Sequence, residues 1–503
     1  MAVNLIECFE KTAEHKSAQI AVIHNDESIS FGELRHKARI MGAFLQGLIH
    51  DKNRPAAVIL PKEINIVIAD LGIIYSSNVF MNIDVKTPEE RLSNILSLIQ
   101  PAVIITDRKF HFNTENIPVV FIDDIDFTQE ESESFTFSEV IDTDPFCIIN
   151  TSGSTGTPKG VVLNHRSFFD FMARSNEEFH FDGSEIIGSL SPAVFDIFDF
   201  ELCMLMLNGS QIVLIDAFLA SFPARLLETL NTYRINFIFW VPSIMVNIAN
   251  MNLLEKIPLQ YLKLVWFAGE VFPVRQFLYW YDHLPAVNFA NLYGPIEITL
   301  DCTFYRITSR PPEGEPLPIG RPYRNTDILI LNENDELCSA NEEGELCVRG
   351  TSLAMGYYNN PEKTSQAFTQ NPLNKHYPEI IYRTGDVVRM REDGNIIFVG
   401  RRDTLIKHMG YRIELGEIEH VISNELKIAE NCCVVYDHER KAIVLFYEKA
   451  ESISDKEFRS ALMKHFPAYM IPAKFIRMEL LPRNTNGKID RLKLKNSALK
   501  GDY

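Results

Sequence analysis

The chain has 503 residues, of which 46% are hydrophobic and 23% are charged, and its formal net charge is -18 at pH 7. A chain of this length exceeds the size of a single hydrophobic core, so we expect at least two domains. The acidic charge argues against general nucleic-acid binding, and no apolar run reaches the roughly 18 residues that cross a bilayer.

Targeting and redox signals point to the same compartment. The first residues lack the basic-then-apolar order of a signal peptide. The eight cysteines form no C-x-x-C pair and no zinc-like group. We therefore expect a cytoplasmic protein that binds no membrane and keeps its cysteines as reduced thiols in the core.

The first 310 residues or so alternate apolar runs with amphipathic stretches. The runs are short, rich in β-branched residues and bounded by Pro, Asp or Gly, as buried parallel strands are. They lie at 56–61, 101–107, 117–123, 210–216 and 263–270. Helices are predicted at 88–100 and 223–235. Strands that alternate with helices predict an α/β fold.

The last third of the chain has a different pattern. Glycine-punctuated strands at 327–338, 344–350 and 395–400 predict an antiparallel, β-barrel-like subdomain, and a helix at 414–426 leads into a small α+β tail. Residues 404–503 carry 17 basic and 14 acidic side chains, whereas the rest is strongly acidic. This asymmetry favours a separate C-terminal unit, although a basic face that packs on an acidic neighbour explains the charge equally well.

The stretch "TSGSTGTPKG", from Thr151 to Gly160, has the composition of a phosphate-binding loop. Its glycines let backbone N–H groups converge on an anion, and its hydroxyl side chains add donors. Strand-like runs at 144–150 and 160–165 flank it, which argues against a flexible linker. Neither Gly153 nor Gly156 is placed to complete the Walker A pattern of kinases and GTPases.

Further motifs lie before and after this loop along the sequence. They are "ISFGELRHKA", "MNIDVKTPEERL", "FAGE", "NLYGPIE", "GELCVRGTSLAMGYYNNPEKT", "YRTGDVV", "GRRDTLIKHMGYRIELGEIE", "PAYMIP" and "NGKIDR". Together they resemble the adenylate-forming superfamily, and within it the amino-acid adenylation domains of nonribosomal peptide synthetases and the D-alanine:carrier protein ligases. The resemblance extends from about Ile29 to Arg491, nearly the whole chain.

The resemblance implies an N-terminal adenylation core at 1–402 that binds ATP and Mg²⁺, and a mobile C-terminal lid domain at 403–503. The implied ATP-binding residues are Thr151, Ser152, Gly153, Ser154, Thr155, Gly156, Lys159, Gly269, Glu270, Asn291, Tyr293, Gly294, Asp386 and Arg401. Among them, Tyr293 stacks on adenine and Asp386 binds the ribose hydroxyls. Glu297 is the implied Mg²⁺ ligand, Lys488 the implied catalytic lysine and Asp403 the hinge.

The resemblance also implies a pocket for an amino acid. Its positions are Phe195, Asp196, Ile197, Phe200, Phe239, Trp266, Ala268, Leu292, Leu300 and Asp301. Asp196 falls where amino-acid-activating relatives pair a carboxylate with the substrate α-ammonium, although a helix N-cap is an alternative role for it. Large rings leave little volume, which favours serine, alanine or glycine. Serine comes first because Asp301 can accept a bond from its hydroxyl.

The implied enzyme is an ATP-dependent, AMP-forming ligase that converts an amino acid to aminoacyl-AMP. Because no carrier module follows in the sequence, we expect transfer to the phosphopantetheine thiol of a separate carrier protein. Three alternatives stay open: an acyl-CoA synthetase of the same fold, which Asp196 disfavours; a D-alanine or proline:carrier protein ligase; and a binding protein without catalysis. The last is motivated by Ile296, where relatives usually have Thr or Ser, and by His408 and Met409.

Overall fold

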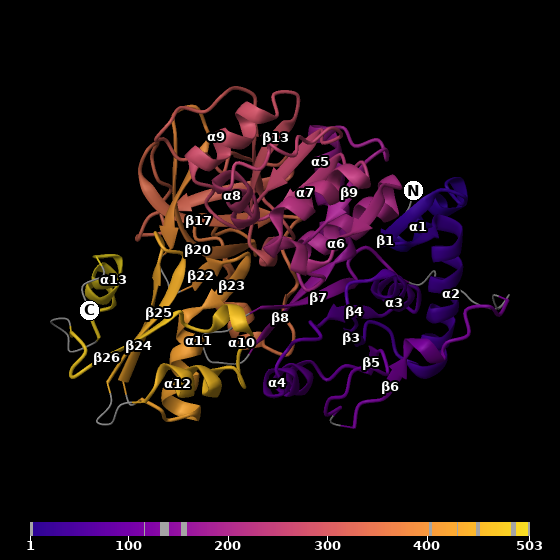
Figure 1. Cartoon of the computed structure of the whole chain (residues 1–503), viewed down its shortest axis with the longest axis horizontal. Helices are drawn as coiled ribbons and strands as arrows, with labels where there is room; N and C mark the ends of the chain where they lie inside the picture. Colours follow the sequence, from indigo (N-terminus) through magenta and orange to yellow (C-terminus); the bar gives the residue numbers. More distant parts are fainter. Residues whose placement is uncertain are drawn as a thin grey trace. The chain divides into compact units, whose positions relative to one another are not determined.

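A computed structural model describes residues 4–114, 116–130, 140–151, 158–401, 405–429, 431–448, 453–483 and 489–500 (Figure 1). The chain divides into two compact units. The larger comprises 1–85, 100–149 and 160–400, and the smaller comprises 86–99, 150–159 and 401–503. The expected domain boundary after residue 402 lies outside the described residues and stays a prediction.

The largest sheet of the fold has nine strands. In spatial order these are β15 (Arg321–Pro322), β14 (Thr303–Ile307), β13 (Asn288–Tyr293), β12 (Leu264–Phe267), β11 (Phe237–Trp240), β9 (Ile186–Ser189), β10 (Gln211–Leu214), β1 (Ile20–His24) and β2 (Glu27–Ser30). The strands from β13 to β1 run parallel, whereas β2 and β14 run antiparallel to their neighbours. The predicted runs at 210–216 and 263–270 are β10 and β12.

A second sheet has seven strands. They are β18 (Gly356–Tyr357), β8 (Lys159–Asn164), β7 (Pro145–Thr151), β4 (Val79–Asn82), β3 (Pro55–Ile59), β5 (Val103–Thr106) and β6 (Val119–Phe121). From β7 to β6 the strands are parallel. Strands β3, β5 and β6 confirm the first three apolar runs that the sequence predicts.

The larger unit covers its sheets with helices. These are α1 (Leu5–His15), α2 (Phe31–Leu48), α3 (Ile64–Tyr75), α5 (His165–Phe179), α6 (Asp196–Cys203), α7 (Pro223–Thr232), α8 (Pro242–Asn250), α9 (Val274–His283) and α10 (Pro361–Ala367), with the short turns η1 (Ile122–Asp124), η2 (Met204–Asn208), η3 (Ala217–Ser221) and η4 (Ile296–Ile298). Helix α3 is buried at every residue except Asn65 because its sequence is apolar on all sides. It packs against α2 and β3.

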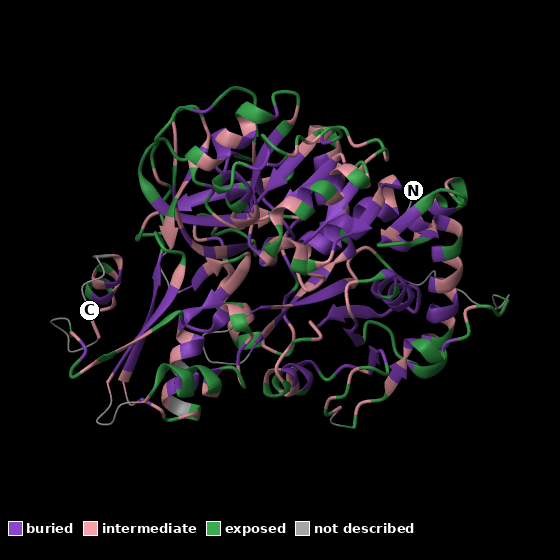
Figure 2. Ribbon diagram, viewed as in Figure 1, coloured by how far each residue is buried: buried purple, intermediate pink, exposed green. Residues whose placement is uncertain are grey.

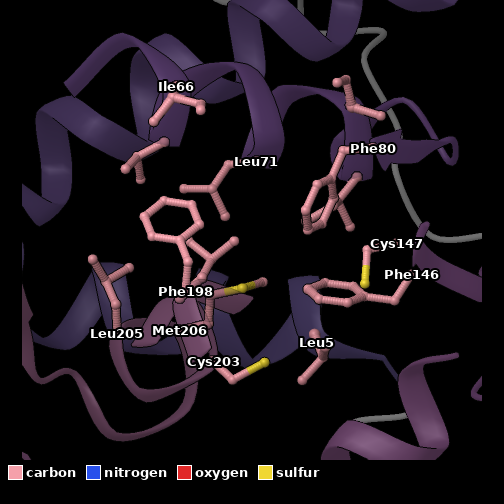
Figure 3. Packing of buried hydrophobic residues seen from close by; sticks show 14 of the residues in the cluster. Leu5, Ile66, Leu71, Phe80, Phe146, Cys147, Phe198, Cys203, Leu205 and Met206 are labelled. Carbon is pink, nitrogen blue, oxygen red and sulfur yellow. The ribbon is translucent and has the colours of Figure 1, made fainter. Parts of the chain in front are cut away.

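One continuous core holds α6 in place. Phe198 of α6 lies in the same buried cluster as Leu71 of α3 and Phe146 of β7 (Figure 3). The ring of Phe146 meets that of Phe80 edge to face, with centroids 5.1 Å apart. Buried residues follow the strands, and exposed ones gather on loops and outer helix faces (Figure 2). Helix α6, which carries several predicted pocket residues, is therefore fixed from both sheets.

The remaining elements form two groups. One is an antiparallel sheet of the larger unit, and the other is the smaller unit, which has an α+β fold. The former contains β16 (Thr326–Leu331), β17 (Glu343–Gly350), β20 (Ile380–Met390), β19 (Phe368–Gln370) and β21 (Ile396–Arg401). The latter contains α4 (Glu89–Ile99), β22 (Leu405–His408), β23 (Tyr411–Glu414), α11 (Leu415–His420), η5 (Val421–Glu425), β24 (Asn431–Asp437), β25 (Ala442–Glu448), α12 (Asp455–Leu462), η6 (Ala468–Met470), β26 (Lys474–Met478) and α13 (Arg491–Lys500). This architecture confirms the predicted fold class.

Two sequence expectations concern cysteines and membranes. All eight cysteines are free thiols; six are buried, whereas Cys8 and Cys338 are partly exposed and so differ from the expected core position. Within the described parts of the chain, every helix is too short or too polar to span a bilayer.

Candidate active site

The predicted site residues of the larger unit collect where parallel strands of the nine-stranded sheet end. Strands β9, β11, β12 and β13 are neighbours, and the segments after their last residues carry Asp196, Ala268, Gly269 and Glu297. Ligands of open α/β sheets bind at the carboxyl ends of the strands. The topology therefore brings together motifs that are far apart in the sequence.

Tyr293 and Asp386 form a buried pair at this edge. Tyr293 is the last residue of β13, and its hydroxyl donates a hydrogen bond to the carboxylate of Asp386 in β20. The amide of Asp386 donates to Thr384 Oγ1 at 3.0 Å, and that hydroxyl donates to the carbonyl of Leu346 at 2.7 Å. Burial, and then the neighbouring carboxylate, raise the pKa of Tyr293 well above its usual range.

Glu297 lies in the short turn η4 directly after β13 and is fully buried. Tyr357 donates its hydroxyl to Glu297 Oε1 at 2.8 Å, and the amide of Ala354 donates to the Glu297 carbonyl at 2.9 Å. Ile296 beside it is half-buried and packs against the main core. A carboxylate held in this way offers hard oxygen ligands of the kind that Mg²⁺ prefers.

The backbone between Gly294 and Asp301 reverses sharply. Thr299 and Leu300 are both buried and both have left-handed φ angles, of 51° and 67°. A Cβ at Gly294 would lie 2.1 Å from the carbonyl oxygen of Leu300, so only glycine fits. The reversal places Leu300 and Asp301 back beside β13. Sequence reasoning missed it, since neither Thr nor Leu favours this conformation.

Three large rings form the centre of the predicted amino-acid pocket. The centroids of Phe200 and Phe239 lie 5.2 Å and 5.5 Å from that of Trp266, and 5.8 Å from each other. All three side chains are buried, and Trp266 Nε1 has no hydrogen-bond partner among the described residues. The other apolar pocket positions, Ile197, Ala268, Leu292 and Leu300, belong to the same buried cluster.

Asp196 is the first residue of α6, and Phe195 occupies the N-cap position without a capping side-chain bond. The alternative in which Asp196 serves as the N-cap is therefore wrong. Both side chains are half-buried. A carboxylate in the first turn of a helix interacts favourably with the helix dipole.

A buried hydrogen-bond network that sequence reasoning missed, formed by Lys62, Ser189 and Glu201, fixes the approach to α6. Lys62 Nζ donates to the carbonyls of Ser189 and Ser191 at 2.7 Å and 2.6 Å, and Ser189 donates its hydroxyl to the carboxylate of Glu201 on α6. Burial raises the pKa of Glu201 to about 7 and lowers that of Lys62 to about 8. The segment that leads to Asp196 is thus held at both ends. The partners are too far apart in the sequence to leave a local signal.

Two predicted ATP-binding residues, Glu270 and Asn291, have structural partners of their own. Glu270 Oε2 accepts a hydrogen bond from the amide of Ser243 at 2.9 Å, in the first turn of α8. Asn291 donates its side-chain amide to the carbonyl of Pro318 at 2.7 Å. Gly269 has a left-handed φ of 90°, which permits the turn after β12.

Other predicted residues belong to the smaller unit or lie outside the described residues. Thr151 is the last residue of β7, and its hydroxyl is buried without a hydrogen-bond partner in the described part of the chain. Lys159 is the first residue of β8, and Arg401 is the last residue of β21. The predicted residues Ser152, Gly153, Ser154, Thr155, Gly156, Asp403 and Lys488 lie outside the described residues.

The smaller unit contains a group of possible metal ligands that the sequence did not suggest. Glu90, Glu425 and His465 each place one ligand atom within 4.8 Å of the others. His465 Nδ1 already lies 2.9 Å from Glu90 Oε2 and 3.6 Å from Glu425 Oε2, so ion pairing accounts for the arrangement.

Comparison with known proteins identifies the family. A model of the family described as "AMP-binding enzyme" matches residues 9–358. The chain is 30% identical over 492 residues to surfactin synthase subunit 1 of Bacillus subtilis (strain 168), and 32% identical over 495 residues to bacitracin synthase 1 of Bacillus licheniformis. These matches cover 97% of this chain but only 14% and 9% of the synthases, so the chain spans a small part of their length.

Solved structures share the fold. An NRPS protein containing adenylation and PCP domains, holo-PA1221, superposes with a TM-score of 0.84 at 21% identity, covering 98% of this chain and 84% of that one. The o-succinylbenzoate CoA synthetase MenE of Bacillus subtilis superposes with a TM-score of 0.85 at 19% identity, covering 98% of both chains. Because the family model spans well over half of the chain, this protein belongs to the AMP-binding enzymes, the adenylate-forming superfamily that its motifs predict.

Proposed function

We propose that this protein activates a small amino acid with ATP, as aminoacyl-AMP, and transfers it to the phosphopantetheine thiol of a separate carrier protein. The observation that carries the substrate class is the packing of Phe200, Phe239 and Trp266, whose centroids all lie within 5.8 Å of one another. Rings packed this closely support a substrate with a very small side chain, such as serine, alanine or glycine.

Adenosine is proposed to bind at the Tyr293–Asp386 pair. The ring of Tyr293 offers a flat apolar face for adenine, and the carboxylate of Asp386 accepts hydrogen bonds from ribose hydroxyls. The existing hydrogen bond between the two residues supports this assignment because it orients both groups before ATP binds. The loop from Thr151 to Lys159 is proposed to bind the phosphates.

Glu297 is proposed to hold Mg²⁺ through its buried carboxylate, with Tyr357 fixing the carboxylate in position. When bound, Mg²⁺ supplies positive charge that offsets the charge of the phosphates. Lys488 is proposed to neutralise charge that develops between the substrate carboxylate and the α-phosphate, and Asp403 to be the hinge of the lid.

The proposed chemistry has two displacements. A carboxylate oxygen of the amino acid attacks the α-phosphorus of ATP, and pyrophosphate leaves. The carrier thiol then gives up its proton and attacks the acyl carbon, which forms a thioester and releases AMP. Holding two anions in line for the first displacement requires both positive charge and fixed orientation.

Asp196 is proposed to pair with the α-ammonium group of the substrate. Its place in the first turn of α6, with Lys62 and Glu201 holding the preceding segment, supports a fixed carboxylate at the pocket. Asp301 is buried next to Leu300 and is proposed to accept a bond from a serine hydroxyl. The chirality of the substrate stays open in this proposal.

The test is ATP–pyrophosphate exchange across the twenty L-amino acids, D-alanine, D-serine, β-alanine and a fatty acid. We expect a signal for one small amino acid and a loss of at least about 30-fold in Asp196→Ala, because the ammonium is left unpaired. Asp455→Ala is the matched control, since Asp455 is also the first residue of a helix, α12.

Two outcomes would reject the proposal in different ways. Exchange with the fatty acid, unaffected by Asp196→Ala, would favour an acyl-CoA synthetase. Exchange that is equally absent in wild type and in Lys488→Ala, with every acid, would favour a binding protein without catalysis.

A further inference from the structure

Two buried hydroxyl groups beside the proposed amino-acid pocket have no hydrogen-bond partner. Ser175 of α5 and Tyr323, which directly follows β15, are 0% and 2% exposed. Neither Ser175 Oγ nor the Tyr323 hydroxyl makes a hydrogen bond to any residue that the structure describes. Buried polar groups in native proteins nearly always have a partner, because leaving one unpaired is costly. Both residues lie outside the set of predicted pocket positions, so the proposed function gives these hydroxyls no role.

Ser175 lies on the face of α5 that packs against the proposed pocket. Phe171 and Phe179 stand one turn before it and one turn after it, so the three side chains share one face of the helix. The ring of Phe171 lies 5.9 Å from that of Phe200, and the ring of Phe179 lies 4.6 Å from that of Trp266. Ser175 is therefore placed between the two points at which α5 contacts rings of the pocket.

Tyr323 belongs to the same layer of rings. Its ring centroid lies 5.5 Å from that of Phe171 and 4.5 Å from that of Phe304. Phe304 in turn lies 5.7 Å from Phe179, so the phenol ring joins both ends of the α5 face. The Tyr323 ring thus packs on the same helix face that carries Ser175.

Asp301, the predicted carboxylate of the pocket, lies near the Tyr323 hydroxyl. The backbone amide of Tyr323 donates to the carbonyl of Cys302, the residue after Asp301, at 3.0 Å. Burial raises the pKa of Tyr323 well above its usual range, the Asp301 carboxylate raises it further, and the Ser175 hydroxyl lowers it. A hydroxyl has this effect only on a close neighbour. Tyr323 is therefore adjacent to Ser175 and near Asp301.

We propose that Tyr323 and Ser175 recognise a hydroxyl group on the substrate side chain, so that the activated amino acid is of the serine type rather than alanine or glycine. This inference rests on the proposed function because it concerns the same pocket. The substrate hydroxyl donates to Asp301 and accepts from Tyr323, whose oxygen accepts from Ser175. Each hydroxyl then has a partner, whereas the methyl group of alanine leaves both protein hydroxyls unpaired.

The test compares ATP–pyrophosphate exchange with serine and with alanine of the same chirality in wild type, Tyr323→Phe and Ser175→Ala. We expect wild type to have a kcat/KM for serine at least about tenfold above that for alanine. Tyr323→Phe should lower the value for serine about tenfold and change the value for alanine less than about twofold, and Ser175→Ala should act in the same direction. A purely structural defect would lower both values alike.

Thermal unfolding without substrate gives a second readout. Because the Tyr323 hydroxyl has no partner before substrate binds, Tyr323→Phe should unfold at a temperature no lower than wild type. One control is Tyr447→Phe, since Tyr447 is also buried and its ring also meets a phenylalanine, Phe458, edge to face. The other is Ser167→Ala, which removes a buried hydroxyl two turns earlier on α5. Both controls should keep the preference for serine.

The possible failures separate this inference from the proposed function. A wild-type preference for an amino acid without a side-chain hydroxyl overturns the inference while amino-acid activation stands. A serine preference that Tyr323→Phe and Ser175→Ala leave unchanged does the same. A clear loss of stability in substrate-free Tyr323→Phe also overturns it, since the hydroxyl then has a partner within the protein. Exchange with no amino acid overturns the proposed function, and this inference with it.

Discussion

The hydroxyl of Tyr293 donates a hydrogen bond to the carboxylate of Asp386, a residue 93 positions further along the chain. If this pair orients the adenosine site, Tyr293→Phe keeps the ring and removes the bond. We expect the KM for ATP to rise about fivefold, for a loss of about 1 kcal/mol. Pyrophosphate exchange at varied ATP measures it. The control is Tyr75→Phe, since buried Tyr75 likewise donates to Glu10 but lies outside the site, and an equal change there would contradict the assignment.

Tyr357 should control the affinity for Mg²⁺. Its hydroxyl donates to Glu297 at 2.8 Å, so Tyr357→Phe leaves the carboxylate in place but less firmly oriented. We expect the Mg²⁺ concentration for half-maximal exchange to rise by about threefold to tenfold, with a smaller change in the maximal rate. An unchanged Mg²⁺ dependence in this variant would argue that Glu297 has no part in metal binding.

Trp266 should limit the size of the substrate. Trp266→Leu removes ring volume at the centre of the Phe200–Phe239 contacts, and no hydrogen bond to a described residue is lost with its Nε1. We expect exchange with leucine or methionine to appear and exchange with the small substrate to fall. The variant should be less stable by about 2–4 kcal/mol.

The control for this change is Trp280→Leu. Trp280 is a buried ring in a different hydrophobic cluster, and its Nε1 donates a hydrogen bond to the carbonyl of Met245. It should lower stability without changing the substrate preference. A preference that is the same in wild type and in Trp266→Leu would show that this ring does not face the substrate.

Glu201 should make the protein less stable as pH rises. Burial raises its pKa to about 7 from a usual 4.5, so the folded state binds this proton more tightly than the unfolded state. Its contribution is fully present below pH 4.5 and is lost as pH rises to 7. The quantity to follow is the free energy of unfolding of wild type minus the free energy of unfolding of Glu201→Gln. This difference should fall by up to about 3 kcal/mol as pH rises from 4.5 to 7. Urea unfolding at several pH values measures the difference; a constant difference would contradict the buried state of Glu201.

His165 should have the opposite effect over nearly the same range. It is buried, and burial lowers its pKa to about 4 from a usual 6.5, so the unfolded state binds the proton more tightly. Its contribution to stability is fully present above pH 6.5 and is lost as pH falls to 4. Nδ1 accepts a hydrogen bond from the amide of Leu5 at 3.3 Å, and asparagine can replace that acceptor without titrating. Wild type should therefore lose up to about 3 kcal/mol relative to His165→Asn upon acidification, measured by unfolding.

Local patterns accounted for much of the fold. Strands β3, β10 and β12 lie in the apolar runs that the sequence marks, and helices α4 and α7 lie in the predicted amphipathic stretches. These elements are predictable because a run of β-branched residues or an apolar stripe is a property of neighbouring residues. The alternative role of Asp196 as an N-cap was wrong by one residue, because Asp196 is the first residue of α6 and Phe195 is the N-cap. Helix ends are difficult to predict because they carry weak local signals.

The sequence by itself determined the family and the order of the motifs, because their residue types and spacing can be read along the chain. Only the tertiary structure decided which rings fill the predicted pocket and which partners hold its walls. The contacts of Trp266 with Phe200, the hydrogen bonds of Lys62 and Glu201 to Ser189, and the left-handed turn at Thr299 and Leu300 depend on contacts or conformations that local propensity does not encode. Burial creates them, because distant segments must pack densely and buried polar groups must find partners within that packing.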